Sequence, residues 1–224
     1  HAILEIVDAY VEVKRGSFEK FIDTCEKLKE LEEEKIPKTS EFVLGLLAPN
    51  VDARIFEIVS FAILKYFYFD QTVFFGFEID DIEEENLKLY KTGRTNANDG
   101  GIDFVMKPLG RFFQVTETTD VKKYFLDIDK LEKFPVTFVV KSDETSELLL
   151  SNIRSNAEKQ YSIKAVVDKY ISCIEEIINI PELTSRFNKA VELGKLNDIL
   201  SEIIIQSKVE FNYEDDENEE EDMD

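Results

Sequence analysis

The residues most able to do chemistry are an aspartate and a glutamine on two neighbouring apolar segments. Asp103 is the one charged residue of residues 101–106, and burying a carboxylate there is costly unless it is paired, hydrogen-bonded or bound to a metal. Gln114 ends the next strand-like segment, and a hairpin of this length would return it to the side of Asp103. Glu57 lies in the apolar stretch 55–59, so a helix packed on the sheet could bring it to the same point. We therefore expect polar groups from three elements to converge.

The composition excludes several kinds of site. The only histidine is His1, so Ser-His-Asp, Cys-His and His-ligated zinc sites lack an imidazole. Cys25 and Cys173 are far apart in helix-like contexts and are expected to be buried thiols in a reducing compartment. The longest apolar stretch, 55–69, is too short and too polar to span a bilayer, and no signal peptide is evident. We expect a soluble cytoplasmic protein without a membrane partner, using carboxylates, amides, Lys/Arg or a hard metal ion.

Much of the negative charge belongs to the C-terminal end. The chain of 224 residues carries 27 Lys+Arg and 48 Asp+Glu, for a net charge of −21. Ten of the acids lie in residues 210–224, which leaves 27 − 38 = −11 for residues 1–209. We predict that 210–224 is a disordered acidic tail, because it cannot bury enough apolar surface to offset its ordering entropy.

The remaining chain is predicted to have an α/β (α+β) centre between helical additions. Residues 1–50 form an N-terminal helical part, 51–145 the α/β core and 146–209 a C-terminal helical part that includes one long helix over 163–178. Within the core we expect a mixed sheet flanked by helices, with the order helix, three or four strands, helix, strand. Its elements are a helix over 53–67 capped by Asp52, strands at 72–77, 87–90, 102–106 and 112–115, a helix over 120–133 and a buried strand at 136–140.

Glycine and positive charge concentrate in residues 86–123, which contain four of the 8 glycines and have a charge balance of +3. In an acidic protein this pattern favours the approach of an anionic ligand, although a glycine-rich turn before a hairpin explains it as well. The segment 91–98 also carries side chains that pair with base edges and phosphates, but a polar turn would use the same residues.

The segments 99–104 (Asp-Gly-Gly-Ile-Asp-Phe) and 114–117 (Gln-Val-Thr-Glu), with the element order around them, resemble the PD-(D/E)xK nuclease superfamily. The closest motifs are those of type II restriction endonucleases and the Mrr-like branch. The resemblance covers the predicted core and implies the PD-(D/E)xK fold, with a mixed central sheet flanked by helices.

The resemblance also implies roles for particular residues. Asp103 would be the principal metal ligand, Gln114 would occupy the second acidic position, the carbonyl of Val115 would be a further ligand, and Glu57 would be the helix-borne acid. Oxygen ligands of this kind suit Mg²⁺ or Mn²⁺. The DNA contacts would come from the basic and amide side chains in and after segment 91–98: Lys91, Arg94, Asn96, Asn98, Lys107 and Arg111.

One position departs from the family pattern. Thr116 stands where a lysine is expected, and losing one preorganised electrostatic group typically costs about 3–4 kcal/mol of transition-state stabilisation. Three explanations stay open: Glu117 takes part in a variant site, the protein is a poor or inactive nuclease, or another cation reaches the site. The candidate cations are Lys107, Arg111, Lys122 and Lys123.

The resemblance therefore implies a metal-dependent endonuclease that hydrolyses double-stranded DNA, of the sequence-specific type II restriction class. Such enzymes commonly pair about a two-fold axis, so a homodimer is implied, with the C-terminal helices as its interface. A catalytically inactive nuclease-fold protein that binds DNA or a protein partner is the first alternative. An unrelated α/β interaction protein is the second, and it would be preferred if Asp103 and Gln114 pointed to opposite faces of the sheet.

Overall fold

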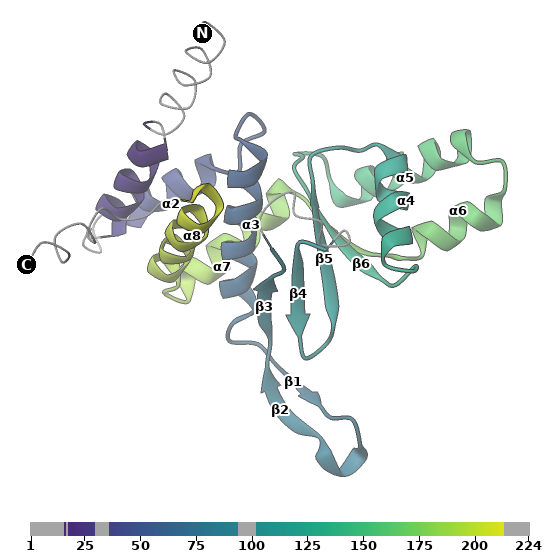
Figure 1. Cartoon of the computed structure of the whole chain (residues 1–224), viewed down its shortest axis with the longest axis horizontal. Helices are drawn as coiled ribbons and strands as arrows, with labels where there is room; N and C mark the ends of the chain where they lie inside the picture. The colour runs from purple at the N-terminus through teal and green to yellow at the C-terminus, as the bar shows by residue number, and fades with distance from the viewer. Residues whose placement is uncertain (1–15, 17, 30–35, 94–101, 213–224) are drawn as a thin grey trace, which may run out of the picture.

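The computed structural model describes residue 16 and residues 18–29, 36–93 and 102–212. Its centre is a mixed sheet of five strands (Figure 1). In spatial order these are β3 (Lys88–Lys91), β4 (Phe104–Lys107), β5 (Arg111–Thr116), β6 (Val136–Val140) and β7 (Ile174–Ile178). Neighbouring strands from β3 to β5 are antiparallel, whereas β6 and β7 continue parallel to β5. The predicted α+β class is confirmed.

One face of the sheet is covered by α3 (Ala53–Tyr68), α7 (Ile180–Glu192) and α8 (Leu196–Phe211), with α2 (Ile36–Gly45) beside α8 (Figure 1). Helix α3 begins where the carboxylate of Asp52 accepts a hydrogen bond from the backbone N–H of Arg54. It is apolar on most of its circumference because it lies between the sheet and the other helices.

The opposite face is covered by α4 (Val121–Lys130), α5 (Ser146–Gln160) and α6 (Lys164–Ile171). These helices form a second apolar core with the side chains of the sheet that point away from α3. Strand β6 separates the two cores, and all five of its residues are buried. Such a strand needs cover on both faces, which explains why every residue of β6 except Thr137 is apolar.

The order α3, β3, β4, β5, α4, β6 follows the predicted helix, strands, helix and strand. The hairpin of β4 and β5 is closed by Gly110, whose φ of +65° is accessible to glycine and whose N–H donates to the carbonyl of Met106. Its register pairs Phe104 with Phe113. This register sets the positions of Asp103 and Gln114.

The predicted long helix over 163–178 is wrong. Helix α6 ends at Ile171, and Ile174–Ile178 form strand β7 beside β6. The C-terminal part is therefore not purely helical, because it supplies a strand to the central sheet and two helices that pack on α3. The β-branched isoleucines fit a pleated surface as well as a helix, and pairing with β6 decides between the two.

The strand predicted at 72–77 does not join the central sheet but belongs to a second small sheet. Strands β1 (Thr72–Phe75) and β2 (Glu83–Asn86) form an antiparallel hairpin that projects from the body, with the 3₁₀ helix η2 (Ile79–Asp81) at its tip (Figure 1). Gly76 lies against the tip backbone, where an added Cβ would be 2.5 Å from the carbonyl oxygen of Asp81. The tip therefore requires glycine at this position.

The structure describes part of each end of the chain. Residues 18–29 are helical, as expected for the N-terminal part, whereas 1–15 and 30–35 lie outside the described residues. The predicted tail begins too early, since α8 continues to Phe211 and the Glu210 carboxylate is buried. Residues 213–224 lie outside the part that the structure describes. Among the described residues, no helix combines the length and apolar character needed to cross a membrane.

Both cysteines are free and buried, as predicted. We expect Cys25 to resist alkylation at pH 8, because it is fully buried and burial raises the pKa of its thiol from 9.0 to about 12. The reactive thiolate should therefore be about a thousandfold scarcer than in the unfolded chain. Mass spectrometry after iodoacetamide treatment, with and without urea, measures this. Equal labelling rates in the two conditions would contradict the packing of residues 18–29 onto the core.

Candidate metal centre

Asp103 and Gln114 meet where β4 and β5 separate. The N–H of Asp103 donates to the carbonyl of Phe113 at 2.9 Å, which places the residue at the end of the hairpin ladder. Its Oδ2 accepts a hydrogen bond from the backbone N–H of Val115 at 2.6 Å. The Gln114 Nε2 donates to the carbonyl of the same Val115 at 3.1 Å. Both side chains thus bind the backbone of Val115, one through its N–H and the other through its carbonyl. Asp103 and Gln114 are each 8% exposed.

The amide of Gln114 has an unusual feature. Its Oε1 is buried and has no hydrogen-bond partner among the described residues. Leaving a buried polar atom unsatisfied costs about 1–3 kcal/mol, so such an atom calls for an explanation. A cation bound beside it would supply one, because a carbonyl-type oxygen is a good ligand for a hard divalent ion.

The oxygen atoms gathered here fit Mg²⁺ or Mn²⁺. They are the carboxylate of Asp103, the Oε1 of Gln114 and the carbonyl of Val115, which a reoriented Gln114 amide would release. In the described ranges, no group of three or more His, Cys, Asp or Glu side chains is placed to hold a metal. A centre at this position would therefore depend on amide and backbone oxygens beside one carboxylate, with water completing the shell.

Glu57 lies on α3 but is engaged by a lysine. Its Oε1 is 2.8 Å from Nζ of Lys91, and both side chains are less than a tenth exposed. The same Nζ is 3.9 Å from a carboxylate oxygen of Glu210 on α8. The buried ammonium holds two helix-borne acids against β3. The structure therefore gives Glu57 a structural ion pair with Lys91.

The two faces of β5 separate the remaining predicted residues. Val115 packs in the core beneath α3, and alternation along the strand places Glu117 on that same side. Gln114 and Thr116 point to the other side, where they pair with Phe138 and Val140 of β6. The acid and the threonine of the 114–117 segment are thus on different faces of the sheet.

Thr116 is 3% exposed, and its hydroxyl accepts a hydrogen bond from the N–H of Thr118 at 3.3 Å. It shapes the turn after β5 and supplies no positive charge. Of the cations expected to compensate, Lys107 and Arg111 lie at the opposite end of the hairpin. Lys107 lies over the ring of Tyr90, and Arg111 binds Glu175 and Glu176 of β7. Lys122 and Lys123 are exposed in the first turn of α4.

The cation that lies next to Thr116 is Lys141, which sequence reasoning missed. Its N–H donates to the carbonyl of Thr116 at 2.9 Å. Its side chain is only 3% exposed, with Nζ 2.5 Å from Glu117 Oε1 and hydrogen-bonded to the carbonyl of Val51. Lys141 directly follows the buried strand β6, and the carboxyl ends of parallel strands are frequent ligand sites. That rule is the sequence signal that could have identified it.

The predicted DNA-contacting residues have different locations. Lys91 is buried in its ion pairs, Arg111 is paired at the far end of β5, and Lys107 is exposed there. Arg94, Asn96 and Asn98 lie outside the described residues. The N–H of Thr92 donates to the carbonyl of Asp103 at 2.9 Å, so Thr92, directly after β3, lies next to the candidate metal centre.

No protein-family model, curated protein or solved structure matches this chain.

Proposed function

We propose that the protein is a metal-dependent endonuclease that hydrolyses phosphodiester bonds of double-stranded DNA, with the PD-(D/E)xK fold of a type II restriction enzyme. The observation that carries this proposal is the convergence of Asp103 and Gln114 on the backbone of Val115, with one amide oxygen buried and unsatisfied. The order of α3, β3–β5, α4 and β6 around it supports the same reading.

In this proposal Asp103 supplies the charged ligand, while the Gln114 Oε1 and the Val115 carbonyl complete the protein's side of a Mg²⁺ or Mn²⁺ site. The bound ion would activate water for in-line attack on the phosphodiester and neutralise developing charge. Asp103 holds its carboxylate in place, because it is buried and its Oδ2 accepts a hydrogen bond from the Val115 N–H of β5. Such preorganisation is what makes electrostatic stabilisation effective.

Lys141 is the best source of the positive charge that Thr116 lacks. It lies on the strand beside Thr116, at the end of β5 that carries the candidate centre. Its ammonium is held on the α3 side by Glu117, whose side chain is half exposed and able to rotate toward water. To reach the sheet edge, the ammonium would have to leave both Glu117 and the Val51 carbonyl, and Glu117 would then act as a positioning residue.

Incubating the full chain with plasmid DNA tests the proposal. We expect discrete fragments with Mg²⁺ or Mn²⁺ and no cleavage with EDTA. Discrete fragments would support a sequence-specific enzyme, whereas a smear would support a nonspecific one. Intact plasmid with both metals, over a range of pH and salt, would contradict the enzymatic proposal.

A catalytically inactive nuclease-fold protein that binds DNA or a protein partner is the second candidate. The engagement of the buried cations Lys91 and Lys141 by carboxylates favours it, because neither ammonium is presented to a phosphate in this arrangement. Binding of duplex DNA without cleavage in any divalent metal would select this candidate.

A further inference from the structure

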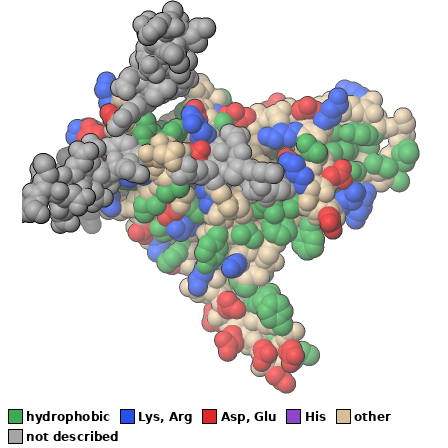
Figure 2. Space-filling view, viewed as in Figure 1, with side chains coloured by type: hydrophobic (Ala, Val, Ile, Leu, Met, Phe, Trp, Pro, Cys, Tyr) green, Lys and Arg blue, Asp and Glu red, His purple; other side chains and the backbone are tan. Residues whose placement is uncertain are grey.

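The hairpin of β1 and β2, residues 69–87, is here called the arm, and it presents large apolar side chains to solvent. Phe77 is 95% exposed, Ile79 88% and Phe74 78%. Figure 2 shows hydrophobic side chains and carboxylates side by side on the projecting arm. Scattered apolar residues are normal on a surface, but a cluster on a projecting tip marks an interaction site.

The charge of the arm restricts what it can bind. It carries seven acids and no lysine or arginine, so a nucleic acid backbone would repel it. The acids are Asp70, Glu78, Asp80, Asp81, Glu83, Glu84 and Glu85. A complementary surface must combine an apolar hollow with positive charge.

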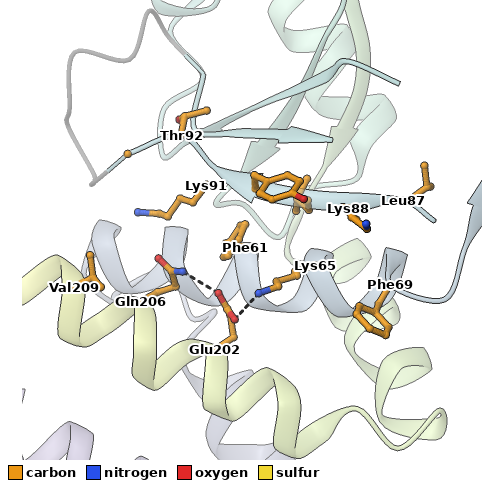
Figure 3. Close-up of a pocket in the computed structure, with 13 residues that line it drawn as sticks. Phe61, Lys65, Phe69, Leu87, Lys88, Lys91, Thr92, Glu202, Gln206 and Val209 are labelled. Carbon is orange, nitrogen blue, oxygen red and sulfur yellow. Dashed lines mark hydrogen bonds and ion pairs between the residues drawn. The ribbon is translucent and has the colours of Figure 1, made fainter. Parts of the chain in front are cut away.

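The described surface of this chain contains such a hollow (Figure 3). A pocket of about 640 Å³ lies between α3, β3 and α8. Its lining includes Phe61, Phe69 and Val209, so it can accept apolar side chains. Three lysines also line it, but two of them are already paired: Lys65 binds Glu202 at 2.7 Å, and Lys91 is buried in its ion pairs. Lys88 is exposed, so it is the positive group of the lining that a docked acidic segment would meet.

The pocket lies at the base of the arm, since Phe69, Leu87 and Lys88 line it where the two strands leave the body. The tip of an arm is about 25 Å away from its own base when extended at about 3.3 Å per residue, so it cannot fold back into the pocket. Two copies with antiparallel arms, however, would place each tip at the base of the other. A two-fold axis would then make both contacts equivalent.

We propose that two copies of this chain exchange arms, each inserting Phe77 and Ile79 into the pocket beside Lys88 of its partner. The exchange covers the apolar tip, neutralises part of the arm's charge and supports a two-stranded hairpin, which is only marginally stable alone. The required Gly76 keeps the tip folded in one shape, which reduces the entropy lost on insertion. This interface differs from the C-terminal helices expected from the sequence and does not depend on the proposed nuclease activity.

Analytical ultracentrifugation of the full chain tests the exchange. We expect a wild-type dimer in the micromolar range and a dissociation constant raised at least about tenfold by Phe77→Ser with Ile79→Ser, and likewise by Lys88→Glu. Leu126→Ser and Lys159→Glu, at exposed positions on α4 and α5, are matched controls that should remain dimeric. Unchanged circular dichroism would show that the variants fold. A monomeric wild type, or arm and pocket variants as dimeric as wild type, would overturn the proposal.

Mixing the two kinds of variant gives a sharper result. An arm variant retains an intact pocket and a pocket variant retains an intact arm, so their heterodimer contains one complete contact. Native mass spectrometry should therefore show more heterodimer than either homodimer. A statistical mixture would exclude reciprocal insertion even if the wild type is a dimer.

Discussion

Replacing Asp103 with asparagine should abolish metal-dependent cleavage of DNA while leaving the protein folded. Asparagine has nearly the same shape, and its Oδ1 can accept the 2.6 Å hydrogen bond from the Val115 N–H that the carboxylate now accepts. The variant loses the charge needed to hold a divalent cation. We expect cleavage to fall by about a thousandfold or more. The measurement is the rate of plasmid cleavage at saturating Mg²⁺.

The control for this variant is Asp198→Asn, which removes an exposed carboxylate in the first turn of α8. It should cleave DNA at the wild-type rate. Urea unfolding and DNA affinity in EDTA should be almost unchanged for Asp103→Asn. A variant that cuts like the wild type would remove Asp103 from the site, even if the hairpin geometry is correct.

The sequence was sufficient to predict this part of the site because local rules determine it. Asp52 identifies the start of α3, and an acidic residue in an apolar strand must find a partner. The turn with Gly110 fixes the hairpin length, which then places Asp103 beside Gln114. Each inference used residues close in sequence, so tertiary structure had little freedom to change the outcome.

Strand β7 was missed because its local pattern fits two structures. The isoleucines of 163–178 recur at helical spacing, and Ile174–Ile178 alone are equally good strand residues. The deciding fact lies elsewhere, in β6, whose five buried residues require a neighbouring strand on each side. If only β5 lay beside it, this largely apolar strand would have left a long apolar edge exposed, which proteins avoid.

Strand β1 of the arm lies within the predicted strand at 72–77, but its partner β2 was missed for a different reason. Strand β2 consists of Glu83–Asn86, all exposed, and shows no alternation of apolar and polar residues. It is held by its pairing with β1 alone, including a hydrogen bond from Thr72 to Glu84. Strands are predicted from the pattern of apolar residues that they bury, and all four residues of β2 are exposed in the single chain. The exposure of the arm in the single chain also makes it a candidate interface.

The positive charge that we propose for the candidate site could not be found within the 114–117 segment, because it would come from a neighbouring strand. Lys141 is adjacent to Thr116 only through the parallel pairing of β5 and β6. Parallel pairing joins residues far apart in sequence, so their proximity depends on the completed sheet. The proposed ligands Asp103 and Gln114 come together through one local hairpin. The proposed cation Lys141 comes close only when β6 has joined the sheet.

Replacing Lys141 with methionine should separate the role of this charge in catalysis from its role in stability. Methionine keeps the apolar stem beside the ring of Phe56, and the half-exposed Glu117 can return to water. We therefore expect the free energy of unfolding to change by less than about 1 kcal/mol. Glu117→Ala should be worse for the fold, because it leaves a buried ammonium with the Val51 carbonyl, and we expect it to cost about 1–3 kcal/mol. Urea unfolding measures both changes.

The activity of the same variants decides whether the charge is catalytic. If Lys141 replaces the lysine expected at Thr116, Lys141→Met should lower the cleavage rate by about 10²–10³-fold although the protein remains stable. Lys159→Met, an exposed lysine of α5, is the matched control and should cleave normally. A stable Lys141→Met protein that cleaves at the wild-type rate would show that the ion pair with Glu117 is purely structural. The site would then have to work through Asp103 and Gln114 without a nearby lysine, because the buried Lys91 is already committed to Glu57.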